Sequence, residues 1–84
     1  MNKSEIIENL SNMANKPISL FDKNGGVLNI KGEYISNWWD LPEIQLTQVN
    51  NKYIFVRDTK TGLNGKFKVS NISEVFDREI TLNI

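Results

Sequence analysis

The change of pattern at Pro17 is the feature that most constrains the fold of this chain. Before it, apolar side chains follow the spacing of one helix face, at Ile6, Leu10, Met13 and Ala14. After it, short runs of β-branched and aromatic residues are separated by Asn and Gly, which is typical of strands joined by tight turns. The sequence therefore predicts a mainly β (α+β) fold, with an N-terminal helix in residues 1–16 and a small barrel of five or six strands in residues 17–84.

The predicted helix has recognisable ends. Ser4 is suited to the N-cap position, and Asn15 can close the helix in a left-handed conformation. Because Pro17 has no N–H to continue the helix, we expect it to end near Asn15 or Lys16. A helix this short is marginal in isolation, so its apolar stripe must dock. The sequence leaves open whether it docks on its own barrel or on a partner.

Turn-forming residues bound the predicted strands. The run Asp22-Lys23-Asn24-Gly25-Gly26 predicts a hairpin, because Asn and Gly tolerate the positive φ of primed turns. Residues 52–58 carry apolar side chains on both faces, which indicates a central strand. The predicted strands cover residues 18–21, 27–35, 43–49, 52–58 and 66–69, and a final strand contains Ile80, Leu82 and Ile84.

The length of 84 residues predicts a single domain around one core. The chain has no cysteine and no histidine, so neither disulfides nor the usual zinc ligands can support so small a fold, and we expect oligomerisation. The lack of cysteine and of an apolar leader segment favours the cytoplasm. No run approaches the ~18 apolar residues that cross a membrane, so no membrane span is expected.

The missing histidine and cysteine also argue against an enzyme, because these side chains are common general bases and nucleophiles. Acidic pairs remain, but they lie on a predicted helix surface or beside a strand, where solvated charge is the more ordinary interpretation. These pairs are Glu5 with Glu8 and Asp77 with Glu79. We therefore expect no catalytic residues, no metal and no cofactor.

The pair Trp38-Trp39 is the least ordinary feature of the sequence. Adjacent side chains on an extended segment point to opposite faces, and two indoles rarely fit one small core. We expect at least one indole to be partly exposed, and beside Pro42 it would suit an anchor for a partner. The other interpretation is structural, with one indole closing the barrel end and the other lying over the helix.

A second candidate cluster combines aromatic and basic side chains. Tyr53, Phe55 and Arg57 alternate on one strand, and four lysines lie nearby in the sequence, at positions 52, 60, 66 and 68. Such a mixture can stack bases and neutralise phosphates, as in proteins that bind single strands. The more ordinary interpretation makes the two rings core residues and leaves the lysines as solubilising charge.

Residues 50–75 carry an aromatic strand, a polar turn with Gly62 and Gly65, a short strand and the pair Ser70-Asn71. In this order they resemble the carboxy-terminal half of a Src-homology-3 domain, which implies an SH3-like barrel. The helix that precedes curved strands, and the hairpin from Ile18 through Gly32, are similar to the opening of Sm-like RNA-binding proteins. That second resemblance implies nucleic-acid binding.

Together these observations predict a non-catalytic protein-interaction or assembly module. Its partner is another protein or a second copy of the chain, and its contact residues are Trp38, Trp39, Tyr53 and Phe55. A regulatory or inhibitory protein of a phage or mobile element fits this build. The alternative is an Sm-like RNA binder, although ten acidic residues cancel ten basic ones and zero net charge disfavours nucleic acid. Its contact residues would be Tyr53, Arg57, Lys66 and Lys68.

Overall fold

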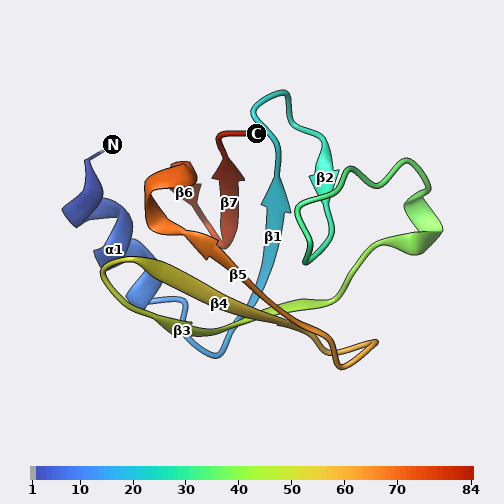
Figure 1. The fold of residues 1–84 in the computed structure, drawn as a ribbon, viewed down its shortest axis with the longest axis horizontal. Helices are drawn as coiled ribbons and strands as arrows, with labels where there is room; N and C mark the ends of the chain where they lie inside the picture. The colour runs from blue at the N-terminus through green and yellow to red at the C-terminus, as the bar shows by residue number, and fades with distance from the viewer. Residues whose placement is uncertain (1) are drawn as a thin grey trace.

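A helix precedes seven strands of one mixed sheet in the computed structural model, which describes residues 2–84 (Figure 1). The predicted fold class, mainly β with an N-terminal helix, is confirmed, although the sheet has seven strands instead of five or six. The elements are α1 (Lys3–Ser11), β1 (Pro17–Phe21), β2 (Val27–Leu28), β3 (Ile44–Val49), β4 (Tyr53–Asp58), β5 (Asn64–Lys68), β6 (Ile72–Phe76) and β7 (Glu79–Leu82). Two 3-10 turns, η1 (Trp38–Asp40) and η2 (Val69–Asn71), complete the order.

Helix α1 is shifted and shortened relative to its prediction. Its N-cap is Asn2 and not Ser4, because the Asn2 side chain accepts a hydrogen bond from the Glu5 N–H at 2.9 Å. The helix ends at Ser11, before the predicted end near Asn15 or Lys16. Asn15 does adopt the expected positive φ of 66°, but its N–H already bonds the Leu46 carbonyl of β3. Residues 12–15 therefore form turns that connect the helix to the sheet, and they do not extend the helix.

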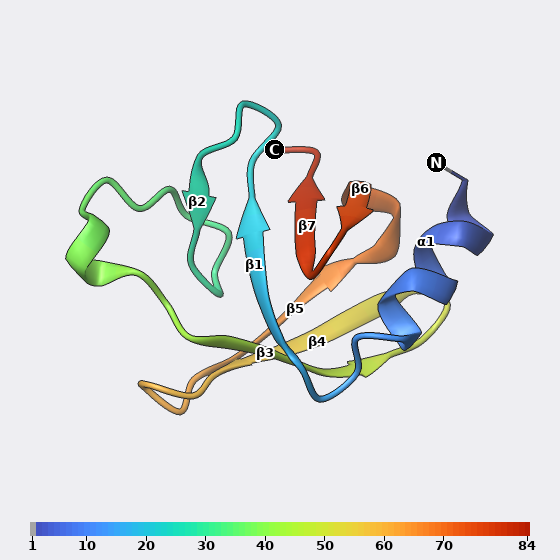
Figure 2. The same ribbon diagram turned by 180° about the vertical axis from the view of Figure 1, so that it is seen from behind.

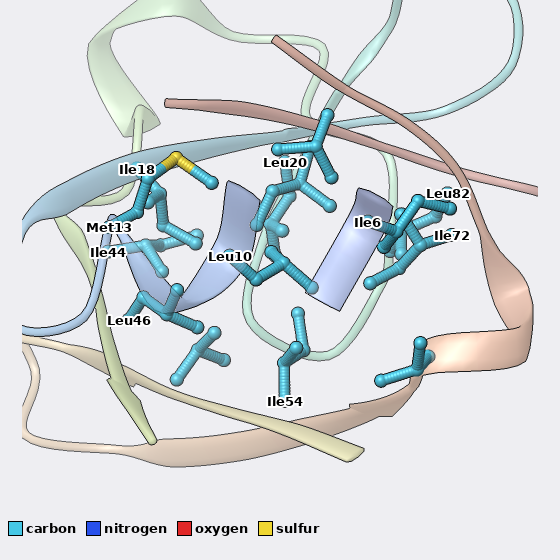
Figure 3. Packing of buried hydrophobic residues seen from close by; sticks show 14 of the residues in the cluster. Ile6, Leu10, Met13, Ile18, Leu20, Ile44, Leu46, Ile54, Ile72 and Leu82 are labelled. Carbon is cyan, nitrogen blue, oxygen red and sulfur yellow. The ribbon is translucent and has the colours of Figure 1, made fainter. Parts of the chain in front are cut away.

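The helix docks on its own sheet. Ile6, Leu10 and Met13 are buried, and α1 contacts β3, β6 and η2. Figure 3 shows Leu10 in the middle of the core, where side chains from the helix and from the strands point toward one another. This packing answers the question that the sequence left open, because the apolar stripe is covered within the same chain.

The sheet order is β5-β4-β3-β1-β7-β6, and β2 also pairs with β1. The beginning of β1 pairs antiparallel with β3, through Ile18 opposite Ile44. Its later part pairs parallel with β7 and antiparallel with β2, so that Leu20 lies opposite both Ile80 and Leu28. Figures 1 and 2 show the result: β1, β7 and β6 stand across the direction of β3, β4 and β5. The core fills the angle between these two parts.

The sheet is not closed into a hydrogen-bonded barrel, because β5 and β6 stand at the two ends of its strand order. The strand predicted over residues 27–35 ends at Leu28. Beyond it, the Asn29 side chain accepts hydrogen bonds from the N–H groups of Lys31 and Glu33, at 2.8 and 3.0 Å, which turns the chain out of the ladder. The resulting loop buries Ile30 in the core.

The prediction missed the hairpin of β6 and β7. Its turn is Asp77-Arg78, and both residues have positive φ, 45° and 66°. Asp tolerates positive φ, but Arg is not typical of the second central position of a primed turn, so the sequence carries only a weak signal for this hairpin. The predicted last strand is confirmed at Ile80 and Leu82, which are fully buried, whereas Ile84 lies beyond β7 and is exposed.

Nothing within residues 2–84 forms a helix of the length and apolar character that a bilayer crossing requires.

The loop of residues 29–33 packs so closely on β5 that Gly65 has no room for a side chain. A Cβ at this position would lie 2.5 Å from the Ile30 carbonyl oxygen. We expect Gly65→Ala to lower the free energy of unfolding by about 1–3 kcal/mol, because backbone has to move. Urea denaturation measures the change. The neighbouring exposed change Asn64→Ala is the control, and equal stability of both variants would contradict the packing of this loop.

A second prediction follows from the packing of α1 on the sheet of its own chain. Leu10 is fully buried, so Leu10→Ala should destabilise the protein by about 2–5 kcal/mol. The loss should be the same at different protein concentrations, because the contacts lie within one chain. Glu8→Ala on the exposed side of the helix serves as the control in the same denaturation experiment. A loss that depends on concentration would indicate that the helix packs on another molecule.

Candidate functional site

The segment of residues 34–42, here called the tryptophan loop, projects from one side of the molecule (Figure 1). The expected extended conformation of Trp38-Trp39 is wrong, because both residues lie in the 3-10 turn η1, where the Asp40 N–H bonds the Asn37 carbonyl. The two indoles do not point to opposite faces; their rings meet edge to face at 5.9 Å and 77°. Trp38 is 76% exposed and Trp39 62%, so the expected exposure holds for both.

Hydrogen bonds hold the tryptophan loop at both ends. The Ile35 N–H donates to the Val27 carbonyl of β2 at 2.9 Å. After the loop, the Thr59 N–H donates to the Glu43 carbonyl at 2.8 Å, and the Lys60 Nζ lies 3.5 Å from the Leu41 carbonyl. The indoles are therefore presented on a segment that is fixed to β2 and to the turn after β4. They neither close an end of the core nor cover the helix.

Two hollows lie beside the tryptophan loop, where β1 leaves β3 and meets β2. One, of about 260 Å³, is lined on its apolar side by Phe21, Val27, Leu41 and Pro42. The other, of about 530 Å³, extends along the start of β1 and β3 to Thr59. Both contain Ile18, Ser19 and Pro42 in their walls. We call the two together the β1 groove.

The tryptophan loop carries only negative charge. Residues 32–51 include Glu33, Asp40 and Glu43 and contain no lysine or arginine. Exposed apolar side chains accompany these acids, because Tyr34 and Leu41 are 66% and 45% exposed. The loop therefore combines several exposed apolar side chains with acidic neighbours in the sequence.

The second candidate cluster lies on the outer face of β4 and β5. Ile54 and Val56 point into the core, so Tyr53 and Phe55 point outward and are half-buried, and Arg57 is exposed. The interpretation of the two rings as core residues is therefore wrong. Strand pairing places Lys68 opposite Tyr53 and Lys66 opposite Phe55. We call these five residues, Tyr53, Phe55, Arg57, Lys66 and Lys68, the β4–β5 face.

Contacts within the β4–β5 face are aromatic and cationic. The rings of Tyr53 and Phe55 lie 6.3 Å apart and are tilted by 50°. The Lys66 Nζ stands 4.7 Å from the centre of the Tyr53 ring, within the range of a cation–π contact. The aromatic and basic residues that the sequence suggested for nucleic acid are therefore brought together on adjacent strands.

The four residues predicted to bind a partner do not form one surface. Trp38 and Trp39 belong to the tryptophan loop, whereas Tyr53 begins β4 at the end of the sheet near α1 (Figure 1). Sequence reasoning missed the contribution of Lys3. This residue joins Asn51, Lys52, Tyr53, Lys68 and Ser70 around a hollow of about 280 Å³. No local pattern indicates this, because only the docking of α1 brings Lys3 to the sheet.

Comparison with known proteins gives no relative: no family model matches the chain, and no curated protein or solved structure is significantly similar to it.

The exposure of both indoles makes a direct prediction for fluorescence. Acrylamide should quench the native protein almost as efficiently as it quenches free tryptophan amide, because 76% of Trp38 and 62% of Trp39 are open to solvent. The single variants Trp38→Phe and Trp39→Phe should each keep an accessible emission. A native protein with one strongly protected tryptophan would contradict the described conformation of η1.

Proposed function

We propose that this chain is a non-catalytic protein-interaction module that binds a partner protein through the tryptophan loop. The observation that carries the proposal is the exposure of two adjacent indoles on a segment fixed at both ends. Tryptophan is among the residues that most often dominate the binding energy of protein interfaces. A fixed segment also loses little conformational freedom on binding, which favours affinity.

The free energy gained by burying the two indoles can be compared with the free-energy cost of association. An aromatic side chain buries ~150–250 Å², so covering the exposed parts of two indoles contributes on the order of 7 kcal/mol at ~25 cal/mol per Å². Association costs ~4–15 kcal/mol of lost motion. The indoles alone offset only the lower half of this range, so a stable complex also needs the contacts of Tyr34, Leu41 and the β1 groove.

The chemistry of the loop also describes its partner. Asp40 lies within the loop, and Glu33 and Glu43 flank it in the sequence, so a partner that offers an apolar pocket with basic residues at its rim would match it. This partner is a different protein or a second copy of the chain. Blocking such a pocket on another protein would give the regulatory or inhibitory role that the small, non-catalytic build suggested.

A relation to SH3-like small barrels is part of the same proposal. The aromatic strand β4 and the 3-10 turn over Ser70 and Asn71 support it, although the sheet is open. Lys68-Val69 and Ile72 stand where that family has proline and tyrosine in its peptide groove. Recognition of polyproline is therefore not proposed.

Affinity purification from the organism's own lysate tests the function. A partner should co-purify with the native chain but not with the double variant Trp38→Ser/Trp39→Ser. The control is Phe76→Ser, because Phe76 is 70% exposed and lies on β6, on a different element. With the partner then purified, each tryptophan change should weaken binding by about 2–4 kcal/mol.

The solution mass of the native chain distinguishes self-association from a different partner. Equal recovery of partners by both variants would refute the proposal.

A further inference from the structure

Although the net charge of the chain is zero, its acidic and basic residues are unevenly distributed along the sequence. Residues 52–68 contain one acidic residue, Asp58, and five basic ones, at positions 52, 57, 60, 66 and 68. Asp58 is buried, and its Oδ1 accepts hydrogen bonds from the N–H groups of Lys60 and Thr61. Its carboxylate therefore stabilises the turn after β4. The basic excess is therefore concentrated on β4, β5 and their connections. The average charge, which disfavoured nucleic acid, does not describe this surface.

The hollow at the end of the β4–β5 face concentrates the charge further. Lys3, Lys52 and Lys68 line it together with Tyr53, and no acidic side chain takes part. Within residues 2–84 none of these three lysines forms an ion pair. Three ammonium groups that share a hollow repel one another, and a bound anion removes that repulsion. The hollow, of about 280 Å³, has room for a phosphate group.

The aromatic residues extend this anion site along β4. Tyr53 and Phe55 alternate on the outer face, with Arg57 next on the same face. Their ring centres are 6.3 Å apart, and Lys66 stands beside them from β5. Open sheet faces of this kind, with rings on neighbouring positions and cations around them, stack successive bases of a single strand. An acidic peptide would satisfy the lysines but would leave the two rings without a planar partner.

We propose that the β4–β5 face binds single-stranded nucleic acid, with a phosphate in the hollow of Lys3, Lys52 and Lys68 and bases on Tyr53 and Phe55. This site does not rest on the proposed function, because it uses none of the residues of the tryptophan loop. The two surfaces share no residue and lie on different elements.

Fluorescence anisotropy with labelled ten-nucleotide oligouridylate and oligothymidylate tests the phosphate site. If three or four phosphates are neutralised, log K should fall with log salt at a slope of about −2 to −3, from ~0.7 per phosphate contact. The double variant Lys52→Ala/Lys68→Ala should flatten this slope by about 1.4. The matched control Lys16→Ala/Lys23→Ala removes the same charge from other elements and should leave the slope unchanged.

The aromatic contribution has its own test. Tyr53→Ala should weaken binding about fivefold to a hundredfold through the loss of one stacked base, whereas Tyr53→Phe keeps the ring and should bind as the native chain does. Circular dichroism confirms that each variant is folded. Trp38→Ser/Trp39→Ser should bind the oligonucleotides normally, which separates this site from the proposed function.

Several outcomes would overturn the assignment. They are the absence of binding at low salt, an equal loss in the Lys16/Lys23 control, and normal binding by Tyr53→Ala. Competition by inorganic phosphate at concentrations comparable with the oligonucleotide would instead identify a site for free phosphate. Equal competition by polyglutamate of the same charge would identify an acidic protein as the ligand.

Discussion

The course of β1 is the constraint on which the rest of the structure depends. Five residues serve both parts of the sheet: Ile18 pairs with β3, and two positions later Leu20 lies between β2 and β7. Since α1 and η2 only cover what these strands enclose, the core exists because β1 changes partners. The same change of partner leaves the β1 groove open beside the tryptophan loop, so one local feature produces both the core and the candidate interaction surface.

Periodicity predicted the elements whose side chains alternate strictly. Residues 53–58 are the clearest case, since Ile54 and Val56 are buried and the residues between them face outward. The prediction failed where a polar side chain competes with the ladder. Asn29 forms a local turn in place of the expected strand, and the turn at Asp77-Arg78 contains neither glycine nor asparagine to mark it. Such competition depends on tertiary support that a short window of sequence does not contain.

The candidate site was predicted in composition but not in arrangement. The aromatic residues at positions 38, 39, 53 and 55 lie outside the core, because large aromatic groups in excess of one small core must face outward somewhere. Their division into two surfaces follows from the direction of β4, which periodicity does not give. The position of Lys3 was the hardest to predict, because it shares a hollow with Lys52 although 49 positions separate the two residues along the chain.

The parallel pairing of β1 with β7 has a consequence for how the molecule forms. Leu20 and Ile80 are neighbours in the sheet although 60 positions separate them in the chain. During synthesis, β1 and β2 leave the ribosome with one of their edges unpaired and wait until the segment of β7 has been translated. Until β7 has joined β1, the incomplete sheet exposes unpaired backbone N–H and C=O groups, and such edges favour aggregation.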